Sequence, residues 1–124
     1  MDNIKALKFD TNGNFTVVAV NDLDDYYREI GCECIDFARR VINGKTYDIA
    51  VDDEGLLKES PIVTALSLFN SYNALVGNLL IFKGVDRDGN MIGITDDDVK
   101  NIKAAARNKL CIDDGTVSMV IMLD

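Results

Sequence analysis

Basic side chains gather in the last third of a chain that is otherwise strongly acidic. Lys100, Lys103 and Arg107 are spaced by three and four residues, while the 124-residue chain has a formal net charge of −8. On one continuous helix they would form a stripe that offers a phosphate the paired donors of arginine and the mobile charge of lysine. The alternative is a solvated helix face whose cations favour the negative C-terminal end of the helix.

Three uncharged side chains near this stretch are further candidates. Phe82 lies mid-strand in the most hydrophobic run, so its ring is either core or a platform on which a base stacks, worth about 1–3 kcal/mol. Asn90 ends a predicted turn, and its amide either completes the turn or reads a base edge. Thr95 and Asp98 have the spacing of a helix capping box.

Most catalytic chemistries are disfavoured. The chain has no histidine, which removes the Ser-His and Cys-His nucleophile pairs. Asp86, Asp88 and Gly89 resemble the start of a calcium loop without its later ligands, so a hairpin turn is expected. No phosphate-cradling glycine loop is present. We expect a protein that is not an enzyme and that needs no metal or cofactor.

The cysteines also disfavour a metal site. Cys32, Cys34 and Cys111 give at most three ligands where structural zinc sites usually have four, so buried thiols in a reducing compartment are expected.

Composition suggests one domain over residues 1–124. No apolar run reaches the roughly 20 residues needed to span a membrane, and the N-terminus lacks the pattern of a signal peptide, so a cytoplasmic location is expected. The acidic balance disfavours duplex nucleic acid, which is bound by neutralising many phosphates. A small anion in a local pocket remains compatible with this charge.

Hydrophobic patterns predict hairpins and about three helices, which together make an α+β fold with a mainly antiparallel sheet. Asn12-Gly13 and Asn43-Gly44 are hairpin turn signals, and Gly31 is a helix C-terminal signal. The predicted strands are 4–9, 15–20, 32–42, 45–51, 78–85, 91–94 and 116–123. The predicted helices are 23–30, 62–72 (led by Ser60-Pro61) and 95–109.

Three further arginines lie in the first half of the chain. Arg28 lies off the apolar stripe of the first predicted helix and has Asp24 as an i,i+4 partner. Arg39 and Arg40 point to opposite faces of a predicted strand, so one of them is expected to meet solvent.

The order of these short motifs resembles a family of small phage- and plasmid-borne domains. The marks that carry the resemblance cover nearly the whole chain: Ile30-Gly31, Asp53-Glu54-Gly55, Ser60-Pro61, Gly77 to Phe82, Asp88-Gly89-Asn90 and Thr95-Asp96-Asp97. Within that group the chain is most similar to phage anti-defence sponge proteins that counter the Thoeris system. The resemblance implies a non-enzymatic homo-oligomer, built from dimers, that holds cyclic ADP-ribose-type signals intact. Some relatives also hold cyclic oligonucleotides.

The resemblance also implies site residues. Phe82 matches the base-stacking aromatic, Asn90 the polar group after the reversal, and Arg107 the helix arginine near adenine and phosphates. Lys103 and Thr95 join them as neighbours on the predicted helix. The weaker candidates for a second anion site, at an interface between chains, are Arg28 and Arg39.

Sequestration needs tight binding, and nanomolar affinity corresponds to about −12 kcal/mol. One stack and a few charged contacts from one small chain do not reach that value, so we expect the pocket at an interface between chains. A protein-interaction module is the alternative, in which Asp22, Asp24, Asp25 and Asp52 to Glu54 mask a basic partner. A cleaving enzyme that uses carboxylates is a third option.

Overall fold

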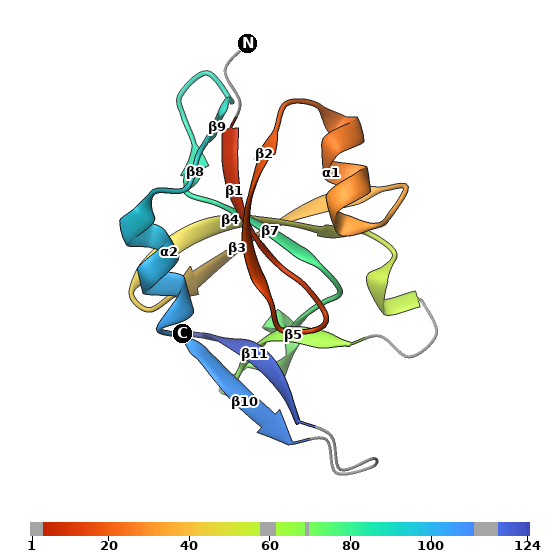
Figure 1. The fold of residues 1–124 in the computed structure, drawn as a ribbon, viewed down its shortest axis with the longest axis vertical. Coiled ribbons are helices and arrows are strands. Elements are labelled where there is room, and N and C mark those ends of the chain that lie inside the picture. Colours follow the sequence, from red (N-terminus) through yellow and green to blue (C-terminus); the bar gives the residue numbers. More distant parts are fainter. Residues whose placement is uncertain (1–3, 58–61, 69, 111–116) are drawn as a thin grey trace.

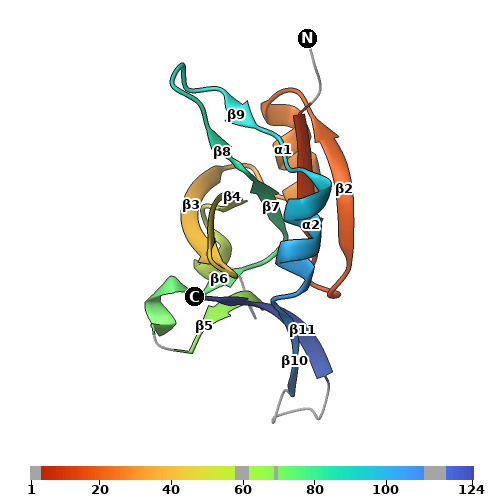
Figure 2. The same cartoon turned by 90° about the vertical axis from the view of Figure 1, so that its left-hand side faces the viewer.

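The centre of the protein is a five-stranded sheet in the order β2-β1-β7-β4-β3, with every neighbouring pair antiparallel. The computed structural model describes residues 4–57, 62–68, 70–110 and 117–124 (Figures 1 and 2). The five strands are β1 (Ile4–Phe9), β2 (Phe15–Val20), β3 (Ile35–Ile42), β4 (Lys45–Asp52) and β7 (Leu79–Phe82).

The two predicted hairpin turns are confirmed, and each uses glycine in the left-handed region. Gly13 has φ 83° in the β1–β2 turn, where the Asp10 carboxylate accepts from the backbone N–H groups of Asn12 and Asn14. Asn43 (φ 48°) and Gly44 (φ 82°) both have positive φ between β3 and β4, as a type I′ turn requires. Local chemistry therefore fixes the register of both hairpins.

Helix α1 (Leu23–Ile30) follows β2 as predicted. The Asp22 side chain accepts from the N–H of Asp25 at its N-terminus, and Gly31 ends it with φ 80°. Asp25 in turn accepts from the Asn21 N–H and from Arg28. These bonds, the one from Asn21 first, lower the pKa of the Asp25 carboxyl. Arg28 is thus partnered by Asp25 at 2.7 Å, one residue from the expected partner Asp24.

A second sheet has the order β10-β11-β5-β6 and lies below the first in Figure 1. Its strands β11 and β5 are parallel, while its other pairs are antiparallel. A short β8–β9 ribbon extends from the end of β7. These elements are β5 (Val63–Ser67), β6 (Leu75–Val76), β8 (Gly84–Val85), β9 (Met91–Ile92), β10 (Ala106–Leu110) and β11 (Val117–Leu123).

The two helices cover opposite faces of the five-stranded sheet. Leu7, Ile49 and Ile81 face one core, which α2 (Asp96–Lys103) and the second sheet complete through Ile102 and Ile121. The opposite face carries Ala6, Ala50, Leu80 and Phe82 against Ile30 of α1. Because β7 is a central strand and packed layers cover both of its faces, all four of its side chains are buried.

The α+β class and the predominance of antiparallel pairing are confirmed, but the described residues form two α-helices, not about three. The predicted helix 62–72 is wrong. Most of its first half is strand β5, which pairs with β11 and β6, and a 3-10 turn spans Ser71–Asn73. An apolar run that covers more than one face suits a strand buried on both sides as well as a buried helix. Ser60 and Pro61 lie outside the described residues.

The last predicted helix begins at the expected residue but ends early. Thr95 and Asp98 form the expected capping box, whereas the helix stops at Lys103 and residues 106–110 become β10. Pairing of β10 with β11 overrides the helix propensity of the alanine-rich segment. Arg107 is consequently a strand residue opposite Val120.

The cysteine prediction is partly wrong. Cys34 is exposed and Cys32 is half-buried in the segment before β3, because that strand begins at Ile35. Cys111 lies outside the described residues.

Candidate functional site

Phe82, the predicted stacking aromatic, has no exposed surface in this chain. Its ring packs in the core under α1, with the Tyr26 ring at 5.6 Å between centroids. A ring in this position has no free face for a base. The packing alternative therefore accounts for Phe82, and its role toward a ligand stays a prediction.

Arg107 and Lys103 are not neighbours on one helix stripe. The Arg107 guanidinium donates to the carbonyl oxygens of Ala104 and Ala106 at 2.7 and 2.8 Å, so it closes the turn between α2 and β10. The Lys103 ammonium lies 5.9 Å from the centroid of the Phe15 ring. Both side chains are exposed, and neither shares a cleft with Phe82 among the described residues.

Thr95 is committed to the helix start. Its hydroxyl donates to Asp98 Oδ2 at 2.7 Å and accepts from the Asp98 N–H. Tyr47 donates its hydroxyl to the other Asp98 oxygen at 3.1 Å. Burial raises the pKa of Asp98, but the bonds from Thr95 and Tyr47 and the charge of Lys83 outweigh it, so the pKa lies below its ordinary value. This buried network holds α2 to the sheet.

Asn90 lies on the β8–β9 ribbon, with an exposed side chain. Its backbone N–H donates to Asp86 Oδ1, and its carbonyl accepts from the Asp86 N–H, both at 2.9 Å. The backbone of Asn90 thus closes the turn. Its side-chain amide has no hydrogen-bond partner among the described residues. Its chain neighbours Gly89 and Met91 line the cleft described next.

A cleft of about 490 Å³ opens between the outer strand β3 and the β8–β9 ribbon. Its volume falls in the range of roughly 300–1,000 Å³ typical of small-molecule sites. It combines an exposed aromatic ring, an ion pair and aliphatic side chains. The lining residues are Phe37, Arg39, Asp48, Val85, Gly89 and Met91.

The ion pair in this cleft holds Arg39 by one nitrogen only. Arg39 Nε donates to Asp48 Oδ1 at 3.1 Å, and the side chains are 69% and 10% exposed. The terminal guanidinium nitrogens have no hydrogen-bond partner among the described residues. An arginine oriented by a nearly buried carboxylate presents these nitrogens to solvent in a fixed direction, which suits a phosphate or carboxylate.

Cross-strand register places the cleft on the α1 side of the sheet. Arg39 is opposite Asp48, which is opposite Phe82, so these residues form one row across β3, β4 and β7. Tyr26 of α1 lies against this row, with its ring 6.1 Å from Phe37 and 5.6 Å from Phe82. Burial raises the pKa of the Tyr26 hydroxyl. Phe37 is the exposed end of this aromatic chain, at 46%.

The opposite wall is held in place by backbone bonds. The Lys83 N–H donates to the Ile92 carbonyl at 3.0 Å, and the Ile94 N–H donates to the Lys5 carbonyl at 2.8 Å. Gly93 permits this close approach, because a Cβ there would lie 3.2 Å from the Lys5 nitrogen and 3.3 Å from its oxygen. The ribbon that carries Val85 and Met91 is thereby fixed to the backbone of β1 at Lys5.

Arg28 lines a different cleft, of about 520 Å³, at the C-terminal end of α1. Glu33, Asp52 and Glu54 line the same cleft. Three carboxylates around one already paired arginine disfavour an anion. Arg28 and Arg39 therefore line separate clefts within one chain, and their role in an anion site at an interface between chains stays a prediction.

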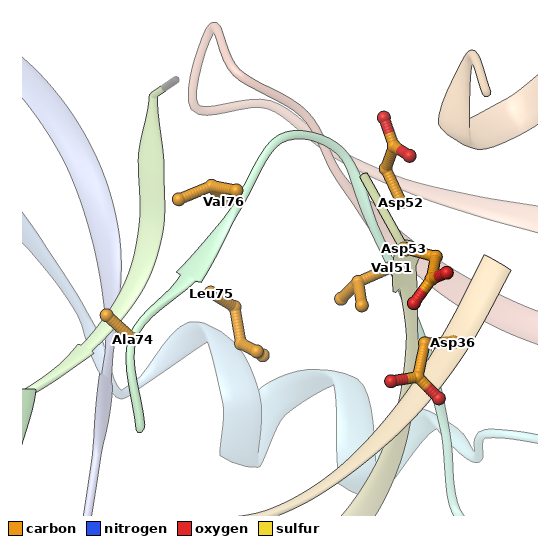
Figure 3. A pocket seen from close by; sticks show the side chains of 7 residues that line it. All are labelled: Asp36, Val51, Asp52, Asp53, Ala74, Leu75 and Val76. Atoms are coloured by element: carbon orange, nitrogen blue, oxygen red, sulfur yellow. The ribbon is translucent and has the colours of Figure 1, made fainter. Parts of the chain in front are cut away.

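A third hollow, of about 150 Å³, lies where the end of β4 meets β6. Figure 3 shows the carboxylates of Asp36, Asp52 and Asp53 along one wall, with Leu75 and Val76 along the other. Within the described part of the chain, no three carboxylates or thiols are grouped closely enough to hold a metal ion. An apolar slot with an acidic rim suits a cationic side chain with an aliphatic stem.

The site residues predicted from the sequence did not include Phe37, Val85 and Met91, which line the cleft. The alternation rule contained one usable signal, because Phe37 and Arg39 are two residues apart on a predicted strand and must share a face. The contribution of the β8–β9 ribbon had no comparable signal, since its position depends on contacts distant in sequence.

The structure is a small α+β domain with a solvent-open cleft at one sheet edge. Residues 4–107 match the profile of a family described as a domain of unknown function, DUF3846. The match covers most of the chain, and the chain belongs to this family. No curated protein and no solved structure gave a significant match. No helix in the described residues is long and apolar enough to cross a membrane.

Proposed function

We propose that this protein binds and sequesters a cyclic nucleotide immune signal without cleaving it, and that the cleft around Arg39 and Phe37 is the binding site. The signal would be a cyclic ADP-ribose isomer, with cyclic oligonucleotides as a second ligand class. In this proposal a phage-encoded homo-oligomer acts in the host cytoplasm and keeps the signal from its effector. The resemblance in the sequence supports the role, and the geometry of the cleft supports this position for the site.

The observation that carries the proposal is the pairing of an oriented guanidinium with an exposed ring in one cleft. Arg39, held by Asp48, offers its terminal nitrogens to a phosphate, and Phe37 offers an aromatic face or edge to a base. Stacking is worth about 1–3 kcal/mol and a hydrogen bond to a charged group about 1.5–3 kcal/mol. The lining residues include no histidine, lysine or cysteine, which is consistent with a ligand that leaves unchanged.

The binding free energy that sequestration needs favours a site built from more than one chain. The stack and the Arg39 contacts together fall short of the about −12 kcal/mol that a nanomolar complex requires. A second chain that covers this solvent-open cleft would supply further contacts and exclude water. The proposal therefore includes a homo-oligomer in which the cleft is closed by a neighbour.

The test is calorimetric titration with cyclic ADP-ribose isomers and with cyclic di- and trinucleotides, followed by heat denaturation and mass spectrometry of the released ligand. We expect one class to bind and to be recovered intact. Recovery of a cleaved product would replace sequestration with catalysis.

Two arginine variants locate the site. Arg39→Ala is expected to weaken binding at least tenfold, because it removes the one cation that lines the cleft among the described residues. Arg107→Ala is the matched control, since Arg107 is also exposed but, among the described residues, donates only to carbonyl oxygens of its own turn. The reverse result, with binding lost in Arg107→Ala alone, would return the site to the predicted set around Phe82.

A second function is favoured by the acidic slot shown in Figure 3. In such an interaction module, a lysine or arginine of a basic partner would enter the slot between the carboxylates and Leu75. Among the acidic residues expected to serve this role, Asp22 and Asp25 already accept hydrogen bonds at the α1 N-terminus, which leaves Asp24 and the acidic residues at the end of β4. Silence across the nucleotide panel, with binding of a basic peptide that Asp53→Asn weakens, would favour this function.

A further inference from the structure

The two edges of the five-stranded sheet differ in how their outward backbone groups are satisfied. Strand β3 is one edge and strand β2 is the other. An edge strand exposes a row of N–H and C=O groups that can pair with another strand, so proteins usually block such edges with charges or local hydrogen bonds. β3 is blocked in this way, and β2 is not.

At the β3 edge, the chain satisfies three of its own outward groups. The Phe37 N–H donates to the Asp36 carboxylate at 2.8 Å, and the Arg39 carbonyl accepts from Arg40 at 2.9 Å. The Val41 carbonyl accepts from the Asp124 N–H at 2.9 Å. Charged side chains within β3 add to this protection.

The outward residues of β2 follow from its register. The Asp10 N–H donates to the Asn14 carbonyl at the end of the β1–β2 hairpin. Hydrogen-bonded and non-hydrogen-bonded pairs alternate along an antiparallel ladder, so Thr16 and Val18 direct their backbone groups toward β1. The backbone groups of Phe15, Val17 and Ala19 therefore point to the free edge.

Nothing in the described part of the chain blocks this edge. The outward groups of Phe15, Val17 and Ala19 have no hydrogen-bond partner among the described residues. The strand has the sequence Phe-Thr-Val-Val-Ala-Val, without a charge, proline or glycine. Val17 is 50% exposed, and Figure 2 shows β2 as the outermost ribbon on its side of the molecule.

We propose that β2 pairs with β2 of a second copy, antiparallel about a two-fold axis at Val17, and joins the two sheets into one. This register places Val17 opposite its own copy and Phe15 opposite Ala19. The outward N–H and C=O groups of the two strands then face each other. Large side chains thus meet small ones at each end. This proposal does not depend on any ligand.

Charge and closure identify the partner as another copy of this chain. Each copy has a formal net charge of −8, so two copies repel each other overall, and a strand without charged residues such as β2 adds no local repulsion to a contact between them. A two-fold contact covers both free edges at once, whereas an unrelated register would leave an edge open for further growth. Stable interfaces bury roughly 1,200–2,000 Å² in total. A six-residue strand supplies only part of this area, so the dimer is weak and concentration-dependent.

The test is analytical ultracentrifugation over a wide range of protein concentration, without ligand. We expect the wild type to change from monomer to dimer. Val17→Lys should weaken dimerisation at least tenfold, because like charges would lie directly opposite each other on the axis. Val41→Lys is the matched control, since Val41 is an exposed valine (39%) on the blocked edge, and should dimerise like the wild type.

A charge swap separates pairing at Val17 from general destabilisation. Val17→Lys and Val17→Glu should each be monomeric, and an equimolar mixture should form the heterodimer. A wild type that stays monomeric at its solubility limit overturns the proposal. So does a dimer that Val17→Lys leaves intact, or a mixture of the two folded variants that does not associate.

Discussion

Two phenylalanines on the same face of one sheet have opposite fates. Phe82 of β7 is 0% exposed, while Phe37 of β3 is 46% exposed, and Tyr26 contacts both rings. β7 has a strand on each side and α1 above it, whereas β3 is the edge of the sheet. The position of a strand within the sheet, and not the type of residue, decides which aromatic can meet a ligand.

An aromatic residue in the most hydrophobic segment of a chain is therefore a poor candidate for a ligand-binding ring. The strongest apolar run in a small domain is the one that the fold needs most at its centre. An aromatic available for binding is better sought in a mixed strand, where charged neighbours keep the strand at an edge. Phe37, two residues before Arg39, fits this description.

The largest expected effect is from Phe82→Ala. Removing a fully buried ring leaves a cavity under α1, and we expect a loss of about 3–5 kcal/mol in the free energy of unfolding. Urea denaturation followed by circular dichroism measures it. A loss below about 1 kcal/mol would mean that the ring is not packed, and would revive its role as a ligand platform.

The next largest effect is expected at the buried carboxylate of Asp98. Asp98 is 2% exposed in a network with Thr95 and Tyr47, whereas Asp48 borders the cleft. We expect Asp98→Asn to lower the free energy of unfolding by about 2 kcal/mol at neutral pH, because its hydrogen bonds involve a charged acceptor. Thermal or urea unfolding at several pH values is the measurement.

The pH dependence of this difference has a defined sign. The pKa of Asp98 is lower in the folded protein than its ordinary value, so its charge stabilises the fold above that ordinary value of about 3.9. This contribution is lost as pH falls through the folded-state pKa. The gap between wild type and Asp98→Asn should therefore narrow below about pH 4, and a constant gap down to pH 2 would contradict the assignment.

A smaller effect is expected at the wall of the cleft. Gly93→Ala places a methyl against the Lys5 backbone, and we expect a loss of about 1 kcal/mol, because the short β9 can shift away from β1. The same shift should weaken ligand binding. Gly44→Ala is a useful contrast, since nothing lies within 4 Å of its Cβ position and only its positive φ adds strain.

The smallest effect on stability is expected at Phe37. Phe37→Ala should change the free energy of unfolding by about 0.5 kcal/mol, because the ring is half exposed at an edge strand. Ligand affinity should nevertheless fall about tenfold, which corresponds to about 1.4 kcal/mol of lost stacking. Calorimetry alongside urea unfolding separates the two effects. Equal losses in both would make Phe37 a packing residue and weaken the comparison.

The first half of the chain was predictable because its signals are local. The hairpin glycines, the Asp22 cap and the Gly31 C-terminus each act within a few residues, and the β1 to β4 segments and α1 were predicted on that basis. In the second half, residues 63–67 and 106–110 both read as helix. Their strand conformation depends on β11, which is distant in sequence from β5.

The candidate site shows the same division. Arg39 was among the weaker predicted residues, and the alternation of β3 places Phe37 on its face. The cleft itself requires the β8–β9 ribbon to fold back on β1 through the Lys5 and Ile94 backbone. No periodicity in the sequence encodes that contact.

By itself, the sequence determined the turns, the caps and the alternation of side chains, because these depend on the backbone preferences of single residues and on neighbours a few positions away. Only the tertiary structure decided which strand is central, which edge is blocked and which arginine lines a cleft. Those outcomes depend on pairing between distant segments, where burial and hydrogen bonding outweigh local propensity.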